Sequence, residues 1–501
     1  MTRRARAMRT ERRRASFLLA AVLLAGAGCG PSAGEREDPP VLSDRYGVEE
    51  PAAAPLQRPR LVVLYVLDAL RADHVGHLGG SAGISPTLDR LAAEGASFRR
   101  HWSTGPNTLA AIRNLFTGEV WAHSRSWRAA GATRATLAEA FRDAGYRTGL
   151  FSANGYVSTR FGLARGFEHV SREALFEEPA PGEPFVNRSA ERVHAATLAW
   201  LDALTGDEPV FLYLQPIHPH NPYAPPEDLE RRFTAGIPSK IRGDTRTLIS
   251  IQRGRLKPSP ADRERLQGLY AASVAQNDRE LASLLEALAS RFPPAETLVM
   301  VTSDHGEELF DHGGVLHGYT LYEELLHVPL IVRWPGTVRP GSIGLPTDAL
   351  DLHATLLEVA GAPARTPPGP GRSLLPLLAA GGSPLAARPL FAAAPGVSGG
   401  IAAIRDGDWK LIRVGGSRRG WVMGTGAGRS RDPEYLFDLT ADPGERHNLA
   451  GHGGAREERL RARLRAWLEE RGRVGAGEPE RPEEPLDEET ERRLRALGYV
   501  D

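Results

Sequence analysis

The chain has 501 residues, with 62 lysines and arginines against 62 aspartates and glutamates, so its formal net charge is zero. This balance argues against a nucleic-acid-binding protein, which usually carries a basic excess. The length allows two or more domains, and the composition is that of an ordinary globular protein.

The first 29 residues have the features of a secretion signal. Arg3–Arg14 is strongly basic, and Phe17–Gly28 is apolar but too short to span a bilayer. The only cysteine, Cys29, follows at once, as at a bacterial lipoprotein processing site, although Gly26 stands where such sites usually carry leucine. The segment predicts an exported protein, either a periplasmic one released by a plain signal peptidase or a lipoprotein anchored through Cys29.

Beyond the signal, the composition predicts a tether and then a folded α/β region. Residues 30–59 are rich in proline, alanine and acidic residues and are expected to form a disordered linker. From residue 60 to about 365, strand-like and helical segments alternate, which predicts a mostly parallel sheet sandwiched by helices. The expected strands are 61–68, 147–151, 210–214, 297–303 and 328–332, and the expected helices are 85–94, 137–144, 190–204 and 266–292.

A second, smaller region follows a break rich in proline and glycine at 361–370. Its short strand-like runs and one helical segment predict an α+β subdomain with an antiparallel sheet over residues 371–474. The expected strands are 390–393, 401–405, 409–413 and 435–438, and the expected helix is 455–471. An acidic tail, residues 475–501, contains one amphipathic piece at 489–497.

Two of the predicted strands end in aspartate. Leu61–Asp68 and Thr297–Asp304 are apolar runs, and the second continues directly into His305. Ligands of open parallel sheets bind beyond the carboxyl ends of the strands, so these three side chains are expected at one rim. Their oxygen and nitrogen donors form the ligand set of a divalent metal site. The alternative is two buried strands that end in ordinary aspartate turns.

Six blocks of sequence follow one another in the order of a known family. They are Asp68-Ala-Leu-Arg-Ala-Asp-His74 with 85–95, Pro219-His-Asn-Pro-Tyr223, 303–332, Arg405-Asp-Gly-Asp-Trp-Lys-Leu411, 436–446 and 493–500. These blocks resemble the sulfatase family of the alkaline phosphatase superfamily. The resemblance covers about residues 60–500 and implies an alkaline-phosphatase-like α/β fold with a small C-terminal subdomain. It also implies a hydrolase of sulfate or phosphate esters in residues 60–365.

The chain departs from the family at the nucleophile. The sulfatase signature is Cys or Ser, any residue, Pro, Ser and Arg, and its Cys or Ser is oxidised to formylglycine. The trailing Leu-Phe-Thr-Gly sets the register, so Thr108 takes the nucleophile position while Ala110, Ala111 and Ile112 replace the Pro, Ser and Arg. No formylglycine is expected, and phosphoryl esters are favoured because water can hydrolyse a phosphothreonine. Thr108 is also expected to be the N-cap of a helix, which is its alternative role.

The resemblance implies one divalent metal ion, Ca, Mn or Zn. Compared with a sulfatase site, one carboxylate is lost and an imidazole is gained, which favours Mn or Zn. Asp278 is a weaker candidate for extra metal support. The implied ligands are Asp68, Thr108, Asp304 and His305.

The resemblance also implies four catalytic residues: Thr108, His220, His317 and Arg71. The two histidines match family residues that contact the transferred group or protonate the leaving oxygen. Arg71 is expected either to bind the anion or to pair with Asp68.

The expected partner is an anionic ester substrate, with no nucleic acid and with membrane contact only through a lipid on Cys29. Two alternatives use the same pattern. The first is a phosphoethanolamine- or phosphoglycerol-type transferase. The second is a non-catalytic surface binding protein that kept the fold and lost the chemistry.

Overall fold

The computed structural model describes residues 58–120, 135–171, 186–361, 370–379, 384–394, 400–415, 434–475 and 491. The predicted signal, nearly all of the predicted linker and the amphipathic piece at 489–497, apart from Glu491, lie outside these residues. In the ranges just given, no helix combines the length and the apolar character needed to cross a membrane.

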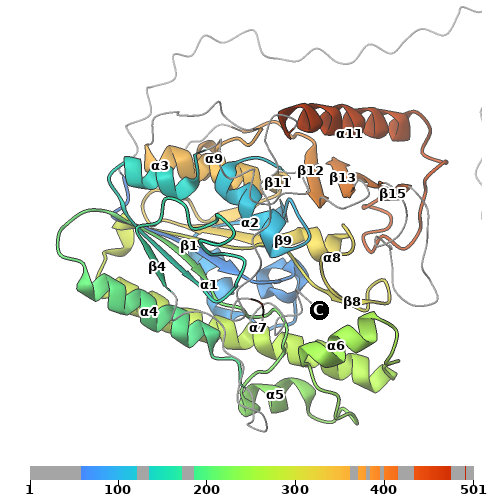
Figure 1. Cartoon of the computed structure of the whole chain (residues 1–501), viewed down its shortest axis with the longest axis horizontal. Coiled ribbons are helices and arrows are strands. Elements are labelled where there is room, and N and C mark those ends of the chain that lie inside the picture. The colour runs from blue at the N-terminus through green and yellow to red at the C-terminus, as the bar shows by residue number, and fades with distance from the viewer. Residues whose placement is uncertain are drawn as a thin grey trace, which may run out of the picture. The chain divides into compact units, whose positions relative to one another are not determined.

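A mostly parallel sheet forms the centre of the described structure, with nine strands among these residues (Figure 1). Strand β1 (Leu61–Leu67) lies between β5 (Val210–Gln215) and β6 (Thr297–Ser303) and is parallel to both. The register pairs Leu67 with Ser303. The next residue of each strand, Asp68 and Asp304, therefore leaves the sheet at the same edge.

The other strands extend the sheet on both sides. The order is β10-β2-β9-β6-β1-β5-β3-β4, with β11 paired to β2, and β9 runs antiparallel to β6 and β2. The bounds are β2 Ala96–Trp102, β3 Arg147–Ser152, β4 His169–Ser171, β9 His327–Arg333, β10 Gly341–Ile343 and β11 Thr347–Asp348.

Helices cover both faces of this sheet because its central strands are apolar on both sides. Leu61, Val63 and Tyr65 share one hydrophobic cluster with α1 (Pro86–Glu94), α4 (Ser189–Ala203) and α7 (Pro260–Ala289). The alternate residues of β1 share the opposite cluster, as the two-residue period of a strand requires. That cluster includes Val62, Leu64, Val66, α2 (Thr108–Thr117), α3 (Leu137–Asp143) and α9 (Ala349–Ala360).

A separate antiparallel sheet lies in the C-terminal region. Its order is β12-β13-β14-β15, and α11 (Gly454–Gly475) packs on one face through Leu460, Leu464 and Trp467. The strands are β12 Leu390–Ala394, β13 Ile401–Asp406, β14 Trp409–Val414 and β15 Glu434–Asp438. The predicted fold class is thus confirmed, whereas the exact boundaries of the two regions stay predictions.

Buried ion pairs join the small sheet to the central one. Lys410 of β14 is fully buried, and its Nζ lies 2.9 Å from Glu323 Oε1 and 2.8 Å from Glu445 Oε1. Arg405 of β13 pairs with the other oxygen of Glu323 at 2.9 Å. Glu323 begins α8 (Glu323–Leu326), directly before β9, so the charges fasten the two sheets together.

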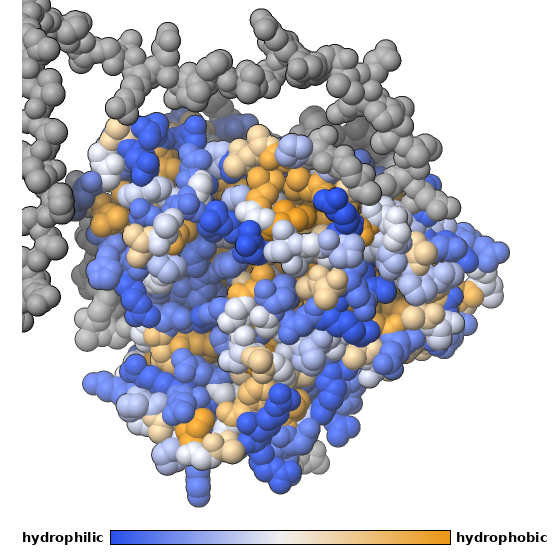
Figure 2. All heavy atoms as spheres, turned by 180° about the vertical axis from the view of Figure 1, so that it is seen from behind, coloured by the Kyte–Doolittle hydropathy of each residue, from blue (hydrophilic) through white to orange (hydrophobic). Residues whose placement is uncertain are grey.

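Sequence patterns did not predict several short helices and strands. They are α5 Glu227–Thr234, α6 Thr245–Gln252, α10 Leu375–Leu378, β7 Glu308–Leu309 and β8 Val315–Leu316. Helix α7 begins at Pro260 rather than at Leu266, because Ser259 and Asp262 form a capping box ahead of the predicted start. On the face shown in Figure 2, hydrophobic residues form small groups among hydrophilic ones.

Candidate active site

The structure brings Asp68, Asp304 and His305 together at the carboxyl ends of β1 and β6. One ligand atom from each lies within 4.8 Å of the others, and all three side chains are buried. His305 Nε2 lies 3.6 Å from Asp304 Oδ2 and 3.9 Å from Asp68 Oδ1. His305 Nδ1 is 2.8 Å from the Gly306 carbonyl oxygen. When Nδ1 donates there, the lone pair of Nε2 points toward the two carboxylates.

Asp68 supplies the observation that fits this cluster to a metal ion. Its Oδ1 is buried and has no hydrogen-bond partner in the part of the chain that the structure describes. Its Oδ2 accepts hydrogen bonds from Asn154 Nδ2 at 2.6 Å and from Gln215 Nε2 at 3.0 Å. Burial, and then the charge of Asp304, raise the pKa of Asp68 well above its usual range. A divalent cation would give Oδ1 a partner and favour the ionised carboxylate.

Thr108 lies against this cluster. Its Oγ1 is 3.3 Å from His305 Nε2, and Asn154 Nδ2 donates a hydrogen bond to it at 3.1 Å. The prediction that Thr108 is the N-cap of α2 was wrong. Asn107 is the N-cap, and its side-chain oxygen accepts a hydrogen bond from Ala110 N at 3.0 Å. Asn107 caps the helix, and the Thr108 hydroxyl lies in the site at the positive end of α2.

Two further histidines stand beside the cluster. The His317 ring lies 4.2 Å from the His305 ring and 4.8 Å from the His220 ring, measured between centroids. The backbone of His220 is held to β1, because its N–H donates to Asp68 O at 3.0 Å. Burial lowers the pKa of both His220 and His317 to about 3. A bound anionic ester would raise both pKa values, because a nearby negative charge favours the protonated ring.

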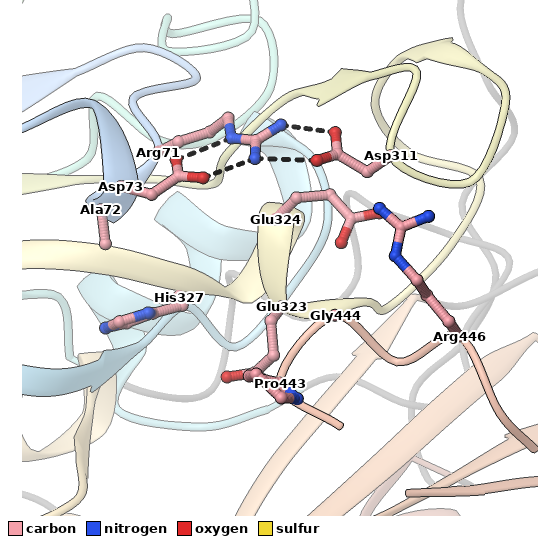
Figure 3. Close-up of a pocket in the computed structure, with 10 residues that line it drawn as sticks. All are labelled: Arg71, Ala72, Asp73, Asp311, Glu323, Glu324, His327, Pro443, Gly444 and Arg446. Carbon is pink, nitrogen blue, oxygen red and sulfur yellow. Dashed lines mark hydrogen bonds and ion pairs between the residues drawn. The ribbon is translucent and has the colours of Figure 1, made fainter. Parts of the chain in front are cut away.

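Arg71 is engaged with carboxylates other than Asp68. Its guanidinium donates two hydrogen bonds to Asp73, at 2.9 and 2.6 Å, and two to Asp311, at 2.6 and 3.0 Å (Figure 3). It also donates to the Glu307 carbonyl oxygen at 3.1 Å. The alternative prediction, that Arg71 pairs with Asp68, was therefore wrong, because Asp73 and Asp311 take its hydrogen bonds. Anion binding by Arg71 stays a prediction.

Arg71 lines a polar pocket of about 210 Å³, whose lining residues are drawn in Figure 3. The other lining residues are Ala72, Asp73, Asp311, Glu323, Glu324, His327, Pro443, Gly444 and Arg446. Its carboxylates have partners: Glu324 lies 2.7 Å from His312 Nδ1, and Glu323 pairs with Lys410 and Arg405. The pocket thus belongs to the ion-pair network that joins the two sheets.

Asp278 is not part of the group formed by Asp68, Asp304 and His305. Its two carboxylate oxygens accept hydrogen bonds from the N–H groups of Thr87 and Leu88, each at 2.9 Å. These are orphan donors of the first turn of α1, so Asp278 caps that helix from a distance in the sequence. The prediction of extra metal support from Asp278 was wrong for this reason.

Two amides that orient the site escaped the sequence analysis as functional residues. Asn154, just beyond β3, bridges Asp68 and Thr108 as described above. Gln215, the last residue of β5, donates through Nε2 to Asp68 Oδ2 at 3.0 Å and to Asp304 Oδ2 at 3.2 Å. Its Oε1 accepts from the Tyr213 hydroxyl at 2.8 Å, which fixes the direction of the amide. Their positions at strand ends are the signal that could have identified them.

Comparisons with known proteins agree with this fold. The family model described as Sulfatase matches residues 60–362. The choline-sulfatase of Rhizobium meliloti (strain 1021) is 25% identical over 418 residues, which are 73% of this chain and 77% of that protein.

Solved structures share the fold over most of the chain. The structure of BT4656 in complex with its substrate D-glucosamine-2-N,6-O-disulfate has a TM-score of 0.62 at 18% identity, covering 85% of this chain and 100% of that one. The phosphonate monoester hydrolase of Agrobacterium radiobacter has a TM-score of 0.62 at 20% identity, with the same coverage.

Proposed function

Because the chain belongs to the sulfatase family of the alkaline phosphatase superfamily, we propose that it is an exported, metal-dependent ester hydrolase whose nucleophile is Thr108. We propose phosphate esters as the preferred substrates and sulfate esters as the second class. One observation carries this proposal: Thr108 Oγ1 lies 3.3 Å from His305 Nε2, at the start of a helix and beside two buried aspartates.

One divalent ion would be held by Asp68, Asp304 and His305, with Thr108 as an exchangeable fourth ligand. When bound, such an ion lowers the pKa of a coordinated hydroxyl and neutralises charge on the group being transferred. The orphaned Asp68 Oδ1 supports a cation at this site, and the mixed oxygen and nitrogen donors favour Mn or Zn.

The reaction needs two displacements at phosphorus. In the first, Thr108 Oγ bonds to phosphorus while the bond from phosphorus to the leaving oxygen breaks. The leaving oxygen takes a proton from the His220 and His317 pair, and the proton that Thr108 loses passes to the same pair, so the step neither gains nor loses a proton. In the second, the oxygen of a water molecule bonds to phosphorus while the bond from phosphorus to Thr108 Oγ breaks. The water gives up a proton and Thr108 Oγ takes one up, and a monoester substrate leaves as inorganic phosphate.

Threonine favours phosphate over sulfate because it has only one hydroxyl. The hydrate of formylglycine carries two hydroxyls on one carbon, so the second can expel sulfate without attack at sulfur. A sulfated Thr108 lacks that exit and would need direct attack by water. The likeness to a choline-sulfatase and to a phosphonate monoester hydrolase supports testing both ester classes.

Export is supported by the N-terminal sequence alone. The basic Arg3–Arg14 segment, the apolar Phe17–Gly28 segment and Cys29 favour a periplasmic protein or a lipoprotein.

The decisive experiment measures hydrolysis of a chromogenic phosphate monoester, a phosphate diester and a sulfate monoester. The purified protein would be assayed with Ca²⁺, Mn²⁺ or Zn²⁺, beside Thr108→Ala and Thr108→Ser. We expect phosphate ester turnover that Thr108→Ala abolishes and Thr108→Ser retains. Sulfate turnover above phosphate turnover would overturn the substrate preference, and full activity in Thr108→Ala would overturn the nucleophile.

A further inference from the structure

We propose that Glu307 is a positioning residue that holds the His317 ring and keeps its proton on Nδ1, and that Tyr223 holds Glu307 in turn. This inference rests on the proposed function, since it gives His317 a defined nitrogen to present to the substrate. It assigns two residues, Glu307 and Tyr223, that the family resemblance left without a role.

The contacts of Glu307 use both of its carboxylate oxygens. Oε1 lies 2.9 Å from His317 Nδ1, and Oε2 accepts a hydrogen bond from the Tyr223 hydroxyl at 3.0 Å. The Glu307 side chain is fully buried. A buried carboxylate with two partners of this kind has one orientation, because any rotation would leave a polar atom without a partner.

A short hairpin places the two residues opposite each other. β7 (Glu308–Leu309) pairs antiparallel with β8 (Val315–Leu316), and Glu308 faces Leu316. Glu307 directly precedes Glu308 and His317 directly follows Leu316, so they are the next pair in the same register. The backbone N–H of Glu307 donates to Glu324 O at 3.1 Å, which ties this end of the hairpin to α8.

Tyr223 comes from a different part of the fold. It follows the loop beyond β5, its ring is buried, and it packs edge-to-face on Tyr270 of α7 with centroids 5.6 Å apart. This packing directs its hydroxyl at Glu307. Tyr223, Glu307 and His317 thus form a chain that runs from the helical layer to the site.

The consequence concerns the second nitrogen of His317. A carboxylate at Nδ1 selects the tautomer with the proton on Nδ1, as the aspartate does in a Ser-His-Asp triad. The Nε2 atom is then the nitrogen that serves the substrate.

The test combines kinetics with a direct reading of the tautomer. Glu307→Gln keeps the shape of the side chain, but its amide can either accept a hydrogen bond from His317 Nδ1 or donate one to it. The variant therefore no longer selects the tautomer with the proton on Nδ1. We expect kcat to fall by about 10- to 100-fold with KM changed less than about threefold. Tyr223→Phe should lower kcat by a smaller factor. Glu308→Gln is the matched control, since this neighbouring buried glutamate accepts from backbone N–H groups of His312 and Gly314 and should leave kcat within about twofold.

The tautomer is read by nitrogen NMR of protein labelled in histidine, with the His317 signal assigned by His317→Gln. We expect the wild-type ring to carry its proton on Nδ1 and the Glu307→Gln ring to show mixed or reversed protonation. An unchanged tautomer in Glu307→Gln, in a protein with wild-type thermal unfolding, would overturn the inference. The NMR result stands whether or not the protein hydrolyses an ester, so failure of the proposed function is recognised separately, by absent turnover in the wild type.

Discussion

The hydroxyl of Thr108 lies 3.3 Å from Nε2 of His305, although the two residues are 197 positions apart in the sequence. Thr108 begins α2 and His305 follows β6. The contact therefore joins a helix on one face of the sheet to the carboxyl end of a central strand. Asn154 closes the arrangement by donating to Thr108 Oγ1 at 3.1 Å and to Asp68 Oδ2 at 2.6 Å. The proposed nucleophile and the proposed metal ligands are therefore held as one unit.

Thr108→Ala should lower phosphate ester turnover by about 10³-fold or more, because no other group takes over a lost nucleophile. Thr108→Ser keeps the hydroxyl and should retain turnover within about tenfold of wild type. The measurement is kcat for a chromogenic phosphate ester under saturating metal. Equal loss of activity in the alanine and serine variants would indicate that the hydroxyl is not the attacking group.

Asp68→Asn should weaken binding of Mn²⁺ or Zn²⁺ more than about 100-fold, since losing a ligand costs more than losing a residue that only orients one. Calorimetric titration of the protein with the metal alone measures this effect. Asp278→Asn is a matched control, because Asp278 is an equally buried aspartate that caps α1. Equal metal affinity in Asp68→Asn and wild type would contradict the proposed site.

Asn154→Ala should lower kcat by about 10- to 100-fold, because one amide orients both the proposed nucleophile and a proposed metal ligand. Ser158→Ala, in the same loop, is the control, since the Ser158 hydroxyl donates only to the nearby Gly155 carbonyl oxygen at 2.9 Å. Steady-state kinetics of both variants is the measurement. A loss as large in Ser158→Ala would show that the loop as a whole, and not the amide, is needed.

Stability should fall between about pH 4.5 and pH 7 through Glu308. Burial, and then the charge of Glu324, raise the pKa of Glu308 to about 7. Between these pH values Glu308 carries a proton in the folded state that it has lost in the unfolded state. The free energy of unfolding therefore includes the full contribution of Glu308 below about pH 4.5, and this contribution is lost as the pH rises through about 7. Its size is up to about 3 kcal/mol.

Glu308→Gln removes this titration. As the pH rises from about 5 to about 8, the free energy of unfolding should therefore fall more in the wild type than in the variant. Chemical denaturation at each pH measures the difference. A difference that stays constant over this range would show that Glu308 has an ordinary pKa.

Lys410→Ala should destabilise the protein by about 3–5 kcal/mol, because it leaves the buried charges of Glu323 and Glu445 without this partner. Arg463→Ala is the control, since its pair with Asp406 is largely exposed and should cost less than about 1 kcal/mol. Chemical denaturation compares the two variants. Similar losses in both would argue against a fastening role for the buried pair.

The small sheet and the central strands could be predicted from the sequence. Leu61–Leu67 and Thr297–Ser303 form strands because each is a short, continuous apolar run. The aspartate that follows each run can be read directly from the sequence. Short elements such as β7 and β8 could not, because two residues carry no periodicity and the hairpin is stabilised by contacts with distant segments.

The amino-acid sequence was enough to predict the layered α/β fold, the meeting of Asp68, Asp304 and His305 at one rim and the place of Thr108 in the family register. It could not predict that Asn107 caps α2, that Asp278 caps α1 or that Asn154 and Gln215 orient the carboxylates. These hydrogen bonds depend on the three-dimensional fold, because the fold decides which strand ends are neighbours. The order β6-β1-β5-β3 brings four strand ends together, and this order cannot be read from the residues of any one segment.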